Sequence, residues 1–175
     1  MVADQLAGIG MNWETRIGKL AVYPGYGVAR IEALQQHEVA GQSLEFLVLR
    51  RLEDETRILI PRDKLDQVGL RTVMKRVEAD RVWEILRTRT RGRRRGGIPW
   101  SRQFREFQDK LRSSSIFETA EVLRDLLRLQ LEKELSFGER KLLENARSLL
   151  VQELAATQGV AADKVEAEIR VAVRR

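Results

Sequence analysis

Short apolar runs alternate with polar residues through the first third of the chain, and turn-forming residues separate these runs. The runs are rich in β-branched and large aliphatic residues and lie at 20–23, 28–34, 43–52 and 56–61. The turns between them contain glycine, proline or clustered carboxylates and lie at 24–27, 40–42 and 53–55. Short strands about ten residues apart, with no crossover helix between them, predict a small antiparallel barrel or a strongly bent sheet.

The period changes to helical spacing after residue 72. Apolar residues then recur three or four positions apart in five segments, at 73–86, 100–113, 116–135, 137–158 and 163–173. Pro99 suits the first turn of a helix, and Gly159 suits a helix end. Ser115 and Ser136 are each followed three positions later by a glutamate, which predicts a capping box at two helix starts. The second half of the chain is therefore predicted to be an all-α bundle.

Together these patterns predict an α+β fold in three parts. Residues 1–15 lack a clear period and are expected to form a loose arm, residues 16–72 a β domain, and residues 73–175 a helical domain. Within the helical domain, residues 87–97 are rich in arginine and glycine. Like charges and glycines both weaken a helix, so an Arg-rich loop is expected there.

Positive charge is concentrated in one stretch of the chain. Between Arg87 and Arg105 there are eight arginines and no acid, whereas the whole chain carries a net charge of +6, so the remainder carries −2. This concentration beside Trp100 favours a polyanion with flat groups to stack on or wedge between, which describes nucleic acid better than a membrane. The alternative is that Arg91 to Arg95 form only a solvated linker.

The three tryptophans differ in the roles that their surroundings indicate. Trp83 lies on an apolar helix stripe and is predicted to be a core residue, and no role is assigned to Trp13. Trp100 opens a helix beside Arg102 and Arg105, where guanidinium groups can hold phosphates while the indole meets a base step. A core or anchoring role for Trp100 is the alternative.

The composition argues against several classes of protein. The chain has no cysteine, which excludes disulfides and thiolate metal sites, and His37 is its only histidine. Because the sequence contains no phosphate-binding loop and no catalytic constellation, we expect no enzyme activity, cofactor or metal. No apolar run reaches the roughly 18 residues that span a bilayer, and the N-terminus lacks a signal-peptide pattern, so a cytoplasmic protein with no membrane partner is expected.

A series of short motifs runs along residues 16–155. They are Val22-Tyr23-Pro24, Tyr26-Gly27-Val28, Gly41, LVLRR at 47–51, Ile60-Pro61, Val68-Gly69-Leu70-Arg71, Pro99-Trp100-Ser101-Arg102, AEVLRDLLR at 120–128 and LSFGERKLLENAR at 135–147. In this order they resemble the motifs of the CarD-like (CdnL-type) bacterial transcription regulators. The hairpin half alone is also similar to the polymerase-interacting domain of transcription-repair coupling factors, whose ATPase motor motifs are absent here.

The resemblance implies a Tudor/SH3-like β domain that docks on the β-subunit lobe of RNA polymerase, and a helical domain that reaches promoter DNA at the upstream edge of the melted region. The family's wedge tryptophan corresponds to Trp100. The family's basic companions of this tryptophan correspond to Arg102, Arg105 and Arg140. The run from Arg91 to Arg95 exceeds the usual family pattern, and from its charge Arg93, Arg94 and Arg95 are also expected to contact DNA. The polymerase-facing strand edge corresponds to His37, Val39, Arg57 and Leu59.

The resulting hypothesis is a monomeric transcription regulator that stabilises the promoter open complex and is associated with the nucleoid through RNA polymerase. Two other functions stay open. One is a polymerase- or protein-docking module that uses no DNA wedge. The other is a basic RNA-binding protein, for which a preference for RNA over duplex DNA at equal salt is the distinguishing observation.

Overall fold

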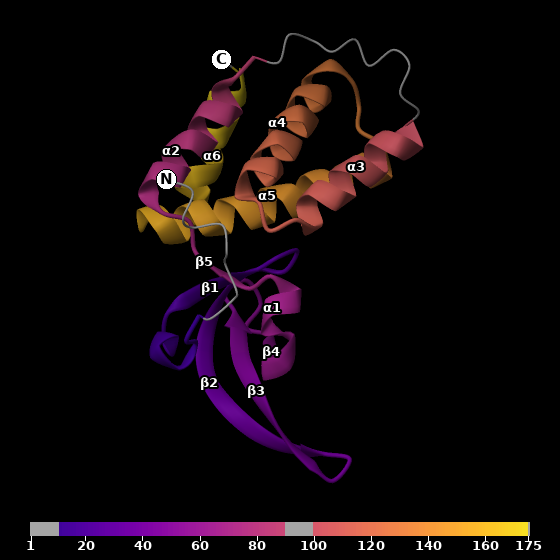
Figure 1. The fold of residues 1–175 in the computed structure, drawn as a ribbon. Coiled ribbons are helices and arrows are strands. Elements are labelled where there is room, and N and C mark those ends of the chain that lie inside the picture. The colour runs from indigo at the N-terminus through magenta and orange to yellow at the C-terminus, as the bar shows by residue number, and fades with distance from the viewer. Residues whose placement is uncertain (1–10, 90–99, 175) are drawn as a thin grey trace, which may run out of the picture. The chain divides into compact units, whose positions relative to one another are not determined.

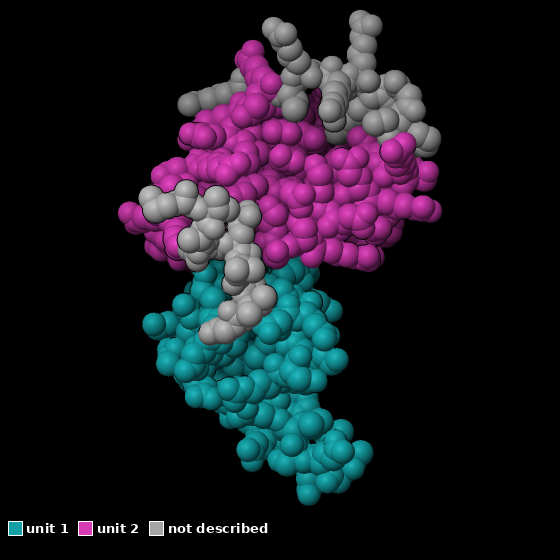
Figure 2. Space-filling view, viewed as in Figure 1, with its two compact units in different colours: residues 1–73 teal, residues 74–175 magenta. Residues whose placement is uncertain are grey.

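The computed structural model describes residues 11–89 and 100–174, and contacts divide the chain into two compact units, residues 1–73 and residues 74–175 (Figures 1 and 2). The first unit, which we call the β-unit, contains a five-stranded sheet. The second, which we call the helical unit, contains helices α2 to α6. The predicted α+β fold is therefore confirmed.

Each strand of the β-unit is antiparallel to its neighbours, in the order β4-β3-β2-β1-β5. The strands are β1 Leu20–Tyr23, β2 Gly27–Val39, β3 Gln42–Arg51, β4 Arg57–Pro61 and β5 Arg71–Thr72. Two 3-10 helices, Glu14–Arg16 and Arg62–Lys64, and the short helix α1, Leu65–Val68, complete the unit. β4 is thus one edge of the sheet.

β2 is longer than the predicted strand at 28–34, and it forms a long curved hairpin with β3 (Figure 1). The register shifts between Ile31 and Ala33, and this bulge explains why the sequence alternates imperfectly there. Ala40 and Gly41 close the hairpin with φ values of 52° and 78°. Among two-residue hairpin turns, type I′ requires this left-handed conformation at both positions, and so short a turn fixes the register of the two strands.

The core of the β-unit lies on one face of the sheet, where Leu47 and Leu49 are fully buried. Trp13 belongs to the same core and is only 6% exposed. Residues 11–15, which the sequence pattern places in a loose arm, are therefore part of the folded unit. The burial of one large aromatic ring holds this segment, and a single ring produces no period in the sequence.

The helical unit packs its helices around one continuous apolar core. The helices are α2 Arg76–Arg87, α3 Trp100–Arg112, α4 Ile116–Glu132, α5 Phe137–Gln158 and α6 Ala162–Arg174. Trp83 is 8% exposed, which confirms its predicted place in the core. α4 ends three residues before the predicted position, because Lys133 adopts an extended conformation and Leu135 enters the core from the turn.

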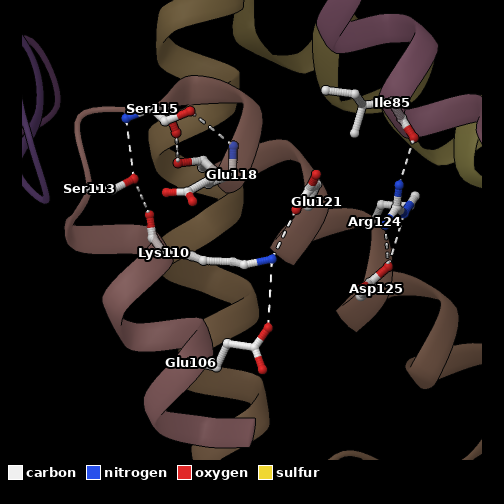
Figure 3. A network of polar contacts seen from close by, with 10 residues as sticks. Ile85, Glu106, Lys110, Ser113, Ser115, Glu118, Glu121, Arg124 and Asp125 are labelled. Carbon is white, nitrogen blue, oxygen red and sulfur yellow. Dashed lines mark hydrogen bonds and ion pairs between the residues drawn. The ribbon is translucent and has the colours of Figure 1, made fainter. Parts of the chain in front are cut away.

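The two predicted capping boxes have different outcomes. At the start of α5 the box is complete, since the Ser136 side chain accepts from the Glu139 N–H and Glu139 accepts from the Ser136 N–H. At the start of α4 only the Ser115 half forms, because the Ser115 N–H donates to the Ser113 hydroxyl at 3.2 Å and not to Glu118 (Figure 3). The prediction of a reciprocal box was therefore wrong at Ser115.

Glu139 is buried to 2% exposure at the first turn of α5. Its carboxylate accepts hydrogen bonds from the Lys133 ammonium at 2.8 Å and from the Ser136 N–H at 2.7 Å. Burial favours the neutral carboxyl, but these hydrogen bonds outweigh burial and hold the pKa of Glu139 below its ordinary value of 4.5. The charged carboxylate therefore stabilises the turn between α4 and α5.

We predict that Glu139→Gln destabilises the helical unit by about 1 kcal/mol at pH 7, because glutamine loses the charge opposite Lys133. The pKa of Glu139 is lower in the folded than in the unfolded chain. The stabilisation is therefore complete above the unfolded value of 4.5 and is lost as the pH falls through the folded value. Urea unfolding of both proteins, followed by circular dichroism, should show a difference that closes on acidification.

The matched control is Glu144→Gln, an exposed position on the same helix, which should change the unfolding free energy by less than about 0.5 kcal/mol at either pH. If the Glu139 variant is equally destabilised at pH 7 and at pH 3, the ionised carboxylate is not the source of the effect.

Candidate functional site

The four residues predicted to face a polymerase lie on one face of the β-unit sheet. Leu47 pairs with Ile60 on the core face, so the neighbouring pair of Val48 with Leu59 points to the opposite face. His37 pairs with Leu44, four residues before Val48, and so lies on this opposite face as well. By the same alternation the docking face, as we call it, comprises His37, Val39, Leu44, Phe46, Arg57 and Leu59.

The docking face carries several exposed apolar side chains. Val39, Leu44 and Leu59 are 46%, 39% and 42% exposed, which is unusual for large aliphatic side chains. His37 is exposed and its ring meets the Phe46 ring edge-on, with centroids 5.5 Å apart. These side chains form a largely apolar surface along the β2–β3 hairpin and the edge strand β4.

The positive charge of Arg57 on this face is partly neutralised. Its guanidinium lies 3.4 Å from the Glu32 carboxylate, which also accepts a hydrogen bond from Arg50. The bond from Arg50 first, and then the charges of Arg50 and Arg57, lower the pKa of Glu32 despite some desolvation. Glu32 stays ionised, so the docking face offers apolar contact more than free positive charge.

In the helical unit, α3 presents Arg102 and Arg105 to solvent. These residues are three positions apart and so lie on one side of the helix. Phe107 and Leu111 are buried on its other side, as the predicted stripe requires. α3 is further tied to α4 by the Lys110 ammonium, which donates to Glu121 at 2.9 Å (Figure 3).

The first turn of α5 packs directly on α3. A Cβ atom at Gly138 would lie 3.2 Å from the Phe104 ring, so only glycine permits this approach without a shift. Phe104 is one helical turn after Trp100, the first residue of α3. The packing therefore places the start of α5, with Arg140, beside the first turns of α3. The side chain of Trp100 itself is outside what the structure describes.

Arg140 is available on this surface. Its side chain is 51% exposed, and its nearest carboxylate partner is Glu134 at 3.7 Å, which is itself 92% exposed. An ion pair between two solvated groups is worth little and exchanges readily for a phosphate. The structure thus leaves Arg102, Arg105 and Arg140 exposed on two helices whose first turns are in contact. Arg93, Arg94 and Arg95, with most of the predicted Arg-rich loop, lie outside the described residues.

Phe137 and Lys141, which lie one turn apart at the start of α5, had no predicted function. Phe137 is 72% exposed, and the Lys141 ammonium lies 5.7 Å from its ring centroid. The helical spacing carried a signal, because Phe137 lies five positions before Leu142 and so falls outside the apolar stripe to which Leu142 belongs. We call Arg102, Arg105, Phe137, Arg140 and Lys141 the α3–α5 surface.

Two further searches of the described residues gave negative results. Within 11–89 and 100–174, no three His, Asp or Glu side chains are arranged so that they could hold a metal ion. None of the described helices combines the length and apolarity needed to cross a bilayer.

Comparison with known proteins links both units to one family. Residues 81–170 match the family model described as the CarD C-terminal domain, and residues 16–74 match the CarD-like/TRCF RID domain. A Bacillus subtilis (strain 168) protein described as "Putative transcription factor YdeB" is 29% identical over 151 residues, which cover 86% of this chain and 97% of that protein.

Two solved structures from Myxococcus xanthus are similar in sequence to part of the chain. CdnLNt is 45% identical and covers 37% of this chain and 90% of its own, with a TM-score of 0.31. The 72-residue N-terminal domain of CarD is 41% identical and covers 32% of this chain and 75% of its own, with a TM-score of 0.28. Because the C-terminal family match alone spans about half of the chain and the second match covers the β-unit, this chain belongs to the CarD-like family of transcription regulators, which act with RNA polymerase.

Proposed function

We propose that this CarD-like protein docks on the β-subunit lobe of RNA polymerase through its β-unit and contacts the upstream edge of the melted promoter DNA through its helical unit, which stabilises the open complex. The observation that carries this proposal is the packing of Gly138 on Phe104. It brings the first turn of α5, next to exposed Arg140, against the first turns of α3, which begin at Trp100 and carry exposed Arg102 and Arg105. A cationic surface with an exposed aromatic group suits the phosphate backbone and base steps of DNA.

The polymerase contact is supported by the family match over residues 16–74 and by the chemistry of the docking face. Exposed Val39 and Leu59 offer apolar area that association can bury. β4, as an edge strand, also carries backbone groups with which an extended segment of a partner can pair. His37 and Arg57 add polar contacts at the border of this area.

The proposed mechanism is a difference in affinity between two states of the promoter. A protein that binds the open complex more tightly than the closed one shifts the equilibrium by that difference in affinity. Inserting the Trp100 indole between base steps costs a few kcal/mol of unstacking, and the cost is smallest where the duplex is already opening. Phosphate contacts from Arg102, Arg105 and Arg140, extended by Arg93, Arg94 and Arg95, position the wedge and carry no sequence information. In this mechanism the polymerase, and not this protein, selects the promoter sequence.

We predict that Trp100→Ala abolishes the stabilisation of open complexes, because alanine cannot fill an opened base step. The lifetime of open complexes after heparin challenge would be measured with RNA polymerase alone, with wild type and with the variant. Wild type should lengthen the lifetime, and Trp100→Ala should return it to the value without the protein. Val77→Ala, at a 79% exposed position on α2, is the control and should act like wild type.

If a folded Trp100→Ala protein lengthens the lifetime as wild type does, the wedge is excluded and the docking module without DNA insertion is the better account. If instead the protein binds single-stranded or A-form RNA more tightly than duplex DNA at equal salt, the RNA-binding function is favoured.

We predict that Arg102→Gln, Arg105→Gln and Arg140→Gln each reduce the steepness of log K against log salt by about 0.9, since each removes one phosphate contact. Fluorescence anisotropy with a partly melted promoter duplex at several salt concentrations gives these slopes. Lys164→Gln, an exposed position on α6, removes the same charge elsewhere and should leave the slope unchanged. Equal slopes for all four variants and wild type would mean that the α3–α5 surface does not bind phosphates.

We predict that Leu59→Glu weakens binding to the isolated β subunit by about thirtyfold, because a carboxylate would have to be desolvated in an apolar contact. Leu52→Glu is a closely matched control, since Leu52 is 39% exposed but lies in the turn after β3. Biolayer interferometry would measure both affinities. The docking face is the wrong surface if the two variants lose affinity equally or not at all.

A further inference from the structure

A hollow of about 370 Å³ lies in the helical unit, away from the first turn of α5, between the last turns of α4 and α6 and the middle of α5. Its lining includes three arginines, Arg147, Arg170 and Arg174, and three apolar side chains, Leu127, Leu131 and Val173. The positive groups and the apolar groups therefore share one concave surface. Nothing in the proposed contacts with polymerase or DNA uses this hollow.

Two arginines of the hollow, Arg147 and Arg170, share one carboxylate and are not neutralised by it. The Glu166 carboxylate lies 3.5 Å from the guanidinium of Arg147 and 3.5 Å from that of Arg170. One carboxylate thus serves two cations, and a guanidinium has five N–H donors, so donors are left for a ligand. The side chain of Arg170 is 60% exposed and that of Arg147 is 30% exposed, which keeps both accessible.

The apolar part of the hollow is also only partly covered. Leu131 is 60% exposed, whereas Val173 is 4% exposed and belongs to the core. An apolar side chain that enters the hollow can therefore contact Val173 and Leu127 and cover Leu131. Such burial is favourable and does not depend on charge.

The mixture of arginines and apolar groups identifies the kind of partner. A DNA backbone offers phosphates but no apolar side chain for a concave surface, whereas an acidic peptide with interspersed leucine or phenylalanine offers both. We propose that this hollow binds an acidic, apolar-containing peptide segment of a partner protein. Its carboxylates pair with Arg147, Arg170 and Arg174, and one apolar side chain occupies the space between Leu127 and Val173.

A competing occupant is a longer stretch of nucleic acid. Arg147 lies seven residues after Arg140 on α5, which corresponds to roughly 10 Å along the helix. Nucleic acid that contacted the α3–α5 surface could extend this far, so the experiment must include it as a ligand. The two ligands differ in one respect, because only the peptide needs the apolar side chains of the hollow, Leu127, Leu131 and Val173.

The test is a fluorescence anisotropy titration of the full chain with a labelled dodecapeptide of Glu-Glu-Leu-Phe repeats. Two control peptides replace the Leu and Phe residues by Ser, or the Glu residues by Lys. A 12-nucleotide single strand and a 12-base-pair duplex complete the set. We expect the acidic apolar peptide to bind at least about tenfold more tightly than either control peptide, because each control removes one of the two chemistries.

Three variants locate the binding. Arg170→Glu should weaken the peptide about tenfold and Leu131→Ser a few fold, while Lys164→Glu, the same charge reversal at an exposed position on the same helix, should change it less than about twofold. Trp100→Ala should bind the peptide as wild type does, so a failure of the DNA wedge would leave this result intact. Thermal melting of each variant checks that the fold is retained.

The proposal is overturned if the acidic apolar peptide binds no better than its Ser or Lys controls, or if Arg170→Glu leaves its affinity unchanged. It is also overturned if Arg170→Glu weakens only the oligonucleotides, because the hollow would then be an extension of the nucleic-acid surface.

Discussion

The buried carboxylate of Glu139 is the constraint on which the candidate DNA-binding surface depends. A buried charge is stable only when hydrogen bonds satisfy it, and Lys133 and Ser136 meet that need from the turn before α5. Satisfying these bonds fixes how the first turn of α5 leaves the end of α4. That turn also carries Gly138 against Phe104 and presents Arg140 to solvent. One buried hydrogen-bonded carboxylate therefore fixes the turn that holds the helix start next to Arg140 against α3.

The two units have opposite surface chemistries. The docking face of the β-unit is mainly apolar and has its arginine paired with Glu32, whereas the α3–α5 surface of the helical unit is cationic with an exposed aromatic ring. Apolar contact gives a protein partner affinity that depends weakly on salt, while phosphate contact falls steeply as salt rises. In the proposed function, the stable attachment is to the polymerase, and the DNA contact follows changes in the promoter.

Local patterns in the sequence predicted the strands, the helix stripes and the buried Trp83, because alternation and helical spacing are properties of neighbouring residues. Features that depend on distant partners could not be predicted. The burial of Trp13 depends on the sheet, and the pairing of Arg57 with Glu32 joins two strands 25 positions apart in the chain. Even a local motif failed at Ser115, where the nearby Ser113 hydroxyl competes for the same N–H. For the site, the sequence could identify Arg140, but its position beside α3 follows from the contact of Gly138 with Phe104.

Because Gly138 has no side chain, a substitution at this position can change the α3–α5 surface. A methyl group there would meet the Phe104 ring at 3.2 Å, so the ring or the two helix starts would have to shift by a few tenths of an ångström. If the helix starts shift, the spacing between Arg140 and the arginines of α3 changes without any change in charge. A mutation at Gly138, which makes no contact of its own in the proposed function, can therefore alter the proposed DNA contact, and an inspection of charged residues alone would not reveal it.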